Sequence, residues 1–324
     1  MKATAITCCA LLLLPAVALG QTVRSVEPPG EPEPAATSEE GADTPWLDTG
    51  HDYIIENADN IAEWMDNFFG VNRAEEEAPY STLRLRTEQE WDEIDGWDSG
   101  LSLRGKVHLP KLNKRVALLF SDDDELTGAD DLLIDRQDSP DDVALQVTAR
   151  ERKHYRVDFK VGLRSSLHPK ASMRYRYEYP LMETLIGRFS EEVLYRGDDG
   201  FGSRTRVEFD KILGENKVVQ WYNRVDWEEE ENGLSWNTGV SLNRRLSDKR
   251  AIGYYVAASG DTHPDYFTTS YGLGLRYRQN IYKHWLFAEV QPSYHWRRAE
   301  YEDDREGAAT ILFRLEAVFT RDWD

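Results

Sequence analysis

Long stretches of the chain alternate apolar and charged residues one by one. Within Lys170–Tyr179 the apolar side chains fall on odd positions and the charged ones on even positions: Met173, Tyr175, Tyr177 and Tyr179 against Arg174, Arg176 and Glu178. Successive side chains of a β-strand point to opposite faces, so this stretch has one apolar and one charged face. On a helix the same residues would scatter around the axis. The pattern predicts a strand, and leaves open which face meets water.

About fourteen such segments follow one another from residue 80 onward, and weak segments could merge or split to give about 12–16. They are longer than the roughly 5–6 residues of soluble strands and match the roughly 9–11 residues of a tilted membrane-spanning strand. The adjacent Glu191 and Glu192 disturb the alternation and predict either a bulge or a misplaced segment boundary. The predicted segments are Tyr80–Glu88, Asp98–Leu109, Arg115–Ser121, Val143–Arg150, Tyr155–Arg164, Lys170–Tyr179, Leu185–Arg196, Phe201–Asp210, Val218–Glu228, Gly233–Asn243, Ala251–Ala258, Tyr266–Arg278, Trp285–Arg297 and Ala308–Phe319.

The joins between the segments are sorted by length and charge. Every second join is short and basic on balance, whereas the joins in between include Ser121–Asp142 and acidic runs such as Gln89–Asp98 and Tyr301–Glu306. Outer-membrane barrels have short periplasmic turns and longer extracellular loops. The sorting therefore favours a barrel whose two ends face different compartments.

The apolar parity suits lipid and the charged parity does not. The chain has 10 Trp and 16 Tyr, many near segment ends on the apolar parity, as in the aromatic girdles of membrane proteins. An Arg facing lipid at mid-depth costs roughly 2–4 kcal/mol, so the charged parity of a membrane barrel must face the lumen. The predicted lumen-lining residues are Arg84, Arg86, Arg104, Lys106, Arg156, Asp158, Lys160, Arg174, Arg176, Glu178, Arg204, Arg206, Glu208, Arg276, Arg278, Glu289, Arg314 and Glu316.

These segments resemble Gram-negative outer-membrane β-barrel proteins as a class. The last segment, Ala308–Phe319, resembles the C-terminal signal of that class, but Thr320–Asp324 are added after it. The resemblance implies an all-β fold: a closed antiparallel up-and-down transmembrane β-barrel of about fourteen strands with a short N-terminal helix. It also implies an outer-membrane location, contact with outer-membrane lipids and lipopolysaccharide, and assembly by the barrel-assembly machinery.

The chain before the barrel divides into three parts. Residues 1–20 have the charged start, apolar run and small-residue cleavage site of a secretory signal peptide, and they contain both cysteines, Cys8 and Cys9. Residues 21–48 are rich in Pro and Glu and are predicted to form a disordered tether. Residues 49–79 are predicted to form an amphipathic helix and a linker, and residues 80–324 the barrel.

The predicted helix has apolar residues at helical spacing: Ile54, Ile61, Trp64, Met65 and Phe68. Three interpretations stay open. The helix packs on the next domain, it plugs the barrel from inside or beneath, or it binds a partner.

The predicted lumen likewise permits two interpretations. Ladders of paired charges could fill a narrow interior, or a water-filled pore could use its surplus of arginine to favour anions, although the acidic loops oppose anions. The predicted function is a passive, porin-like channel or surface barrel with a charged lumen, plugged by the helix. The alternatives are a structural or interaction barrel with a closed lumen and an outer-membrane lipid-modifying enzyme.

Motifs for other chemistry are weak. His168 near Ser165 and Ser166 is the one candidate catalytic neighbourhood, and the acidic loop Asp122–Asp131 lacks the EF-hand arrangement. We therefore expect no enzymatic activity, no cofactor, no metal site and no nucleic-acid partner.

Overall fold

The structure is a computed structural model. It describes Ile61, Trp64, Met65, Phe68 and Phe69 and the ranges 81–109, 115–120, 143–152, 154–163, 168–197, 199–298 and 301–321, all within one compact unit, Pro45–Asp324. The predicted signal peptide, tether, acidic loop and Ser165–Ser166 lie outside the described residues. The described part of the chain has no helix that is long and apolar enough to span a membrane.

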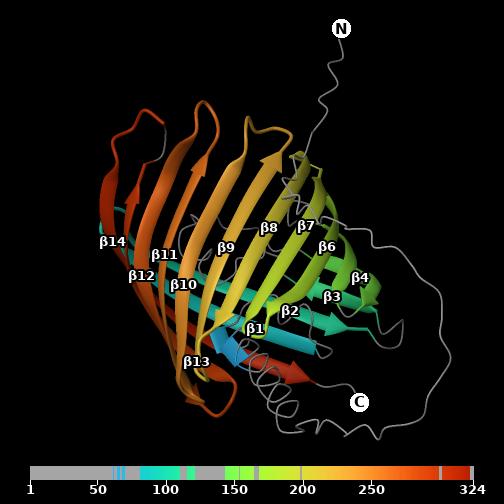
Figure 1. Cartoon of the computed structure of the whole chain (residues 1–324), viewed down its shortest axis with the longest axis horizontal. Helices are drawn as coiled ribbons and strands as arrows, with labels where there is room; N and C mark the ends of the chain where they lie inside the picture. The colour runs from blue at the N-terminus through green and yellow to red at the C-terminus, as the bar shows by residue number, and fades with distance from the viewer. Residues whose placement is uncertain are drawn as a thin grey trace, which may run out of the picture. The chain divides into compact units, whose positions relative to one another are not determined.

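Fourteen antiparallel strands form one closed barrel, in which each strand pairs with its neighbours in sequence and β1 pairs with β14 (Figure 1). This confirms the predicted closed antiparallel barrel and its strand number. The strands are β1 (Ser81–Asp92), β2 (Gly96–His108), β3 (Val116–Phe120), β4 (Val143–Arg152), β5 (Tyr155–Leu163), β6 (Pro169–Met182), β7 (Leu185–Arg196), β8 (Gly200–Ile212), β9 (Lys217–Glu228), β10 (Ser235–Ser247), β11 (Arg250–Asp261), β12 (Phe267–Tyr282), β13 (Leu286–Arg297) and β14 (Glu306–Arg321).

The two ends of the barrel differ in their joins. One end carries the tight joins at 183–184, 213–216, 248–249 and 283–285, and we call it the short-turn end. The other end carries the joins β1–β2, β9–β10, β11–β12 and β13–β14, and we call it the long-loop end.

Burial is inverted relative to a soluble sheet. In β6, Arg174 and Arg176 are only 4% and 9% exposed, whereas Tyr175 and Tyr177 are 36% and 39% exposed. The same holds in β14, where Glu316 is fully buried and Phe313 is half exposed. Because side chains alternate along each strand, charged residues point into the barrel and apolar residues point outward.

The outer surface carries paired aromatic rings near both ends of the strands. Close to the short-turn end, Trp285 stacks on Phe319 with ring centroids 6.0 Å apart. Close to the long-loop end, Tyr271 stacks on Trp296 at 5.3 Å. Rings of this kind, apolar in body and polar at the tip, suit the two interfaces of a membrane.

Two local predictions were wrong. The acidic run Gln89–Asp98 is not a long loop, because β1 continues to Asp92 and β2 resumes at Gly96, where φ is +85°. Glu90, Asp92 and Asp98 of this run line the barrel interior, so they do not interrupt the strands. The adjacent Glu191 and Glu192 cause no bulge, since β7 keeps its register there with both neighbours. Glu192 turns inward to Arg174, and Glu191 accepts a hydrogen bond of 2.6 Å from the Thr205 hydroxyl.

Candidate functional site

The interior next to the seam between β1 and β14 holds a connected network of arginines and carboxylates. The buried Glu316 accepts hydrogen bonds from Arg84, Arg86 (3.1 Å) and Arg278 (2.8 Å). Glu289 accepts hydrogen bonds from Arg278 at 3.2 Å and from Arg314 at 2.7 Å. The sheet register sets these pairs, because Arg86 lies opposite Glu316, and Arg314 and Arg278 lie opposite Glu289. The network ties four strands together with bonds stronger than those between neutral groups.

A second set of pairs follows β5 to β7 around the wall. Asp158 accepts from Arg156 (3.0 Å), Arg176 (2.6 Å) and the Thr148 hydroxyl (2.7 Å). Arg174 binds Glu192 through Nε and Nη2 at 3.1 and 2.6 Å. In both sets the carboxylates are thus paired with arginines of the same strand or of a nearby strand.

The structure places the predicted lumen-lining residues as follows. Arg104 and Arg156 are half-buried, and Glu178 is exposed near the short-turn end, where it accepts a hydrogen bond from Arg188. The others are buried inside the barrel: Arg84, Arg86, Lys106, Asp158, Lys160, Arg174, Arg176, Arg204, Arg206, Glu208, Arg276, Arg278, Glu289, Arg314 and Glu316.

Further interior residues were missed by that prediction. Arg188, Glu192 and Arg196 of β7 share one parity with Ile186, and Asp210 of β8 contacts Arg188. Their signal was the alternation itself, which the adjacent glutamates had obscured.

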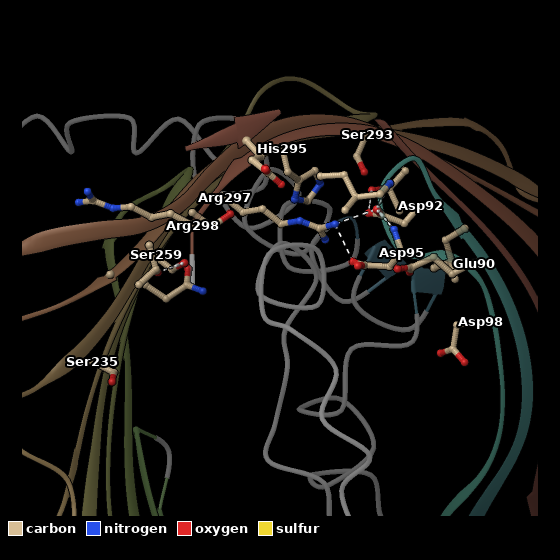
Figure 2. A pocket seen from close by; sticks show the side chains of 18 of the residues that line it. Glu90, Asp92, Asp95, Asp98, Ser235, Ser259, Ser293, His295, Arg297 and Arg298 are labelled. Atoms are coloured by element: carbon tan, nitrogen blue, oxygen red, sulfur yellow. Dashed lines mark hydrogen bonds and ion pairs between the residues drawn. The ribbon is translucent and has the colours of Figure 1, made fainter. Parts of the chain in front are cut away.

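A cavity of about 1000 Å³ opens at the long-loop end. Figure 2 shows Ser235 and Ser259 on one side of it and Glu90 and Asp98 on the other. Arg297 reaches across to Asp92 and Asp95, each at 2.7 Å. Ten carboxylates and three arginines line the cavity, so its wall is strongly acidic.

The acidity extends into the adjoining loop between β9 and β10. Burial, together with the negative charges of Glu228, Asp261 and Asp226, raises the pKa of Glu231. Asp226 and Asp261 also line the cavity. Burial first, and the surrounding carboxylates second, therefore disfavour ionisation of this loop carboxyl group.

The short-turn end has an apolar patch on the inward parity. Its members are each within two residues of a short turn: Ile186, Ile212, Val218, Ala251 and Phe287.

Five residues of the predicted amphipathic helix are described, in helical conformation, and pack on this patch. Ile61, Met65, Phe68 and Phe69 are buried against it, and Trp64 packs beside them. Phe68 meets Phe287 edge to face at 5.7 Å, and the guanidinium of Arg276 lies 5.1 Å from the Phe69 ring centroid. Ile54, also assigned to this helix, lies outside the described residues.

Groups for catalysis are sparse in the described part of the chain. No cluster of three or more His, Cys, Asp or Glu residues suited to hold a metal ion is found there. His295 lines the cavity, and its Nε2 has no hydrogen-bond partner. The serines paired with His168 in the sequence prediction lie outside the described residues.

Comparison with known proteins identifies a fold rather than a family. No family model and no curated protein matches the chain. The structure of OprB from Pseudomonas putida at high pH is similar, with a TM-score of 0.50 and 11% identity over 78% of this chain and 97% of that chain. The KdgM porin (TM-score 0.37, 7% identity, 73% and 99% coverage) and the NanC porin (0.39, 6%, 72% and 98%) also match. The chain has the closed β-barrel fold found in outer-membrane porins.

Proposed function

We propose that the protein is an integral outer-membrane barrel that acts as a passive channel, with the segment around Ile61–Phe69 as a plug at its short-turn end. The long-loop end would face the outside and the short-turn end the periplasm. The outward apolar side chains would contact outer-membrane lipid and lipopolysaccharide. The barrel-assembly machinery would insert the chain.

The inverted burial carries this proposal. In water, the exposed Leu, Val, Phe and Tyr side chains would lose about 25 cal/mol for each Å² of apolar surface that lipid would cover. A charged interior is the arrangement that a water-filled or ion-paired lumen requires. Neither feature benefits a soluble protein.

The plug is supported by the apolar patch of Ile186, Ile212, Val218, Ala251 and Phe287. Apolar residues on the inward parity would be unfavourable against lumenal water, and here they cover the apolar side chains of the helix. Arg245 and Arg276 stack on Trp64 and Phe69, which adds cation–π attraction to the seat.

The test is the conductance of the full chain in planar bilayers after detergent extraction from outer membranes. We expect small openings in the native chain and a severalfold larger conductance in Phe68→Asp, which places a charge in the apolar seat. Phe68→Leu keeps the seat apolar and should match the native chain. Failure to find the native chain in the membrane fraction would sink the barrel proposal, and silence of every variant would sink the channel.

A closed structural barrel is the second candidate. The observation that favours it is the interior network around Glu316 and Glu289, which fills the lumen beside the seam with paired side chains. Under this alternative the protein resides in the membrane, and Phe68→Asp remains silent in bilayers.

A further inference from the structure

We propose that the cavity at the long-loop end binds hydrophilic organic cations with two or more ammonium groups, of which linear polyamines are the simplest. The inference deepens the proposed function and rests on it for the direction from which the solute arrives. Shape, charge and unpaired polar groups of the cavity support it independently of conductance.

The shape comes from small side chains on one wall. The inward residues of β10 to β14 that line the cavity are mostly short: Ser235, Asn237, Ser259, Ser270, Ser293 and Thr310. Deeper in the barrel, Tyr222 and Tyr255 lie across Gly239 and Gly274, where any added side chain would collide with the rings. The rings therefore lie along the wall instead of crossing the lumen. A hollow of about 1000 Å³ is at the upper end of the size range of small-molecule sites.

The charge balance selects cations. Ten carboxylates face three arginines, and each arginine is already engaged. Arg224 binds Asp226 at 2.6 Å, Arg297 binds Asp92 and Asp95, and Arg298 donates to the Thr268 carbonyl at 3.1 Å.

Several carboxylates remain for a ligand. Asp98, Asp304 and Glu306 line the cavity, and no cation of the described residues pairs with them (Figure 2 shows Asp98). They are spread along the rim on β2, β14 and the loop before β14. A ligand with spaced positive charges can reach more than one of them, whereas a single small ion cannot.

Two buried side chains supply the hydrogen-bonding evidence. Gln291 is 2% exposed, its Nε2 donates to Glu289, and its Oε1 has no partner. Asn237 is 5% exposed. Its Oδ1 accepts a hydrogen bond of 2.8 Å from the Tyr222 hydroxyl, and its Nδ2 has no hydrogen-bond partner. Buried polar atoms are rarely left unpaired. An ammonium group of the ligand would donate to Gln291 Oε1. Asn237 Nδ2 is a donor and needs an acceptor, which a protonated amine does not supply.

The experiment is calorimetric titration of the full chain in non-ionic detergent at low salt, with spermidine as the probe. We expect saturable binding that weakens as salt rises, because charge attraction at an exposed rim is screened. The triple variant Asp98→Asn/Asp304→Asn/Glu306→Gln should weaken binding at least tenfold. All three positions are exposed and unpaired, so the barrel should keep its fold, as checked by circular dichroism.

The matched control is Glu215→Gln/Asp248→Asn, which removes negative charge from the short-turn end and should leave spermidine binding unchanged. Gln291→Met should weaken binding a fewfold by removing the acceptor. Glucose and glucuronate should give no heat. Absence of spermidine binding, equal loss in the control variant, or binding of Mg²⁺ in place of spermidine would each overturn the proposal. A silent bilayer with intact spermidine binding would instead overturn only the channel.

Discussion

The middle of the barrel and the cavity at the long-loop end are both rich in charge, yet their charges are arranged differently. Around Glu316 every carboxylate oxygen meets an arginine from a neighbouring strand. Around the cavity, carboxylates outnumber arginines, and short side chains such as Ser235 and Ser259 leave space between the strands. The middle therefore uses its charges to hold strands together, whereas the long-loop end has open space and an excess of negative charge.

Glu316→Gln tests the structural role of the middle and should have the largest effect. Glu316 neutralises Arg84, Arg86 and Arg278 in a fully buried position. Removing one partner of a buried charge pair costs about 3–5 kcal/mol. Urea unfolding from lipid vesicles should show a loss of this size, and Glu178→Gln, at an exposed pair, should lose no more than about 1 kcal/mol. Equal losses of stability in Glu316→Gln and Glu178→Gln would contradict the difference between the buried network and an exposed ion pair.

Phe287→Ala tests the junction between the network and the apolar seat. Phe287 contacts Phe68 on one side and lies 4.6 Å from the Arg278 guanidinium on the other. Because Phe287 is only partly buried, we expect Phe287→Ala to lower the free energy of unfolding by about 2 kcal/mol. Fully buried Phe→Ala changes cost about 3–5 kcal/mol. The control is Phe313→Ala on the outer face of β14, which leaves conductance unchanged. A native-sized conductance in Phe287→Ala would argue against the plug.

Ion selectivity measures the balance between the two regions. Under the channel proposal, the native protein should prefer potassium over chloride in a salt gradient, since the solute meets the acidic cavity first. The triple variant Asp98→Asn/Asp304→Asn/Glu306→Gln should shift the reversal potential toward that of a chloride-selective pore, because the arginines of the middle remain. A reversal potential that does not move would show that the middle alone sets selectivity.

Glu231→Gln should produce the smallest effect and depends on pH. The pKa of Glu231 is raised by burial and nearby carboxylates, so ionisation of this group opposes the folded state. The penalty is absent at pH values below the ordinary range of a glutamate, grows as pH rises through the raised pKa, and is complete at neutral pH. Thermal unfolding should therefore occur at slightly higher temperature in Glu231→Gln at pH 7 and at the native temperature near pH 3. A shift that persists at low pH would point to a contact of the carboxyl group instead.

The strands were predictable because their signal is local. A period of two depends on each residue and its immediate neighbours, so the fourteen strands and the inward parity of Arg174 or Arg314 follow from the sequence alone. The acidic run Gln89–Asp98 misled the prediction, since acids typical of loops also suit a strand whose polar face lines the barrel interior.

The pairing of side chains inside the barrel was harder to predict from the sequence. That Glu316 meets Arg84 depends on the register between the first and last strands, which no local pattern encodes. The cavity depends on where small residues such as Ser259 and Ser293 coincide across strands. The apolar patch did leave a sign in the sequence. Ile212, Val218 and Phe287 break the polar parity beside the short turns, and all three belong to the apolar cluster that includes the helix residues.

The charge pattern at the seam between β1 and β14 also disfavours misaligned pairing of these two strands. Arg86 lies opposite Glu316 and Glu88 opposite Arg314. A slip of one residue would turn one of the two strands inside out relative to the other. A slip of two in one direction would set Arg86 against Arg314, and in the other it would set Glu88 against Glu316. Each of these misaligned closures thus places like charges opposite each other or turns arginines to the outer face of the barrel. The charge pattern of the first and last strands therefore favours a single register at the seam.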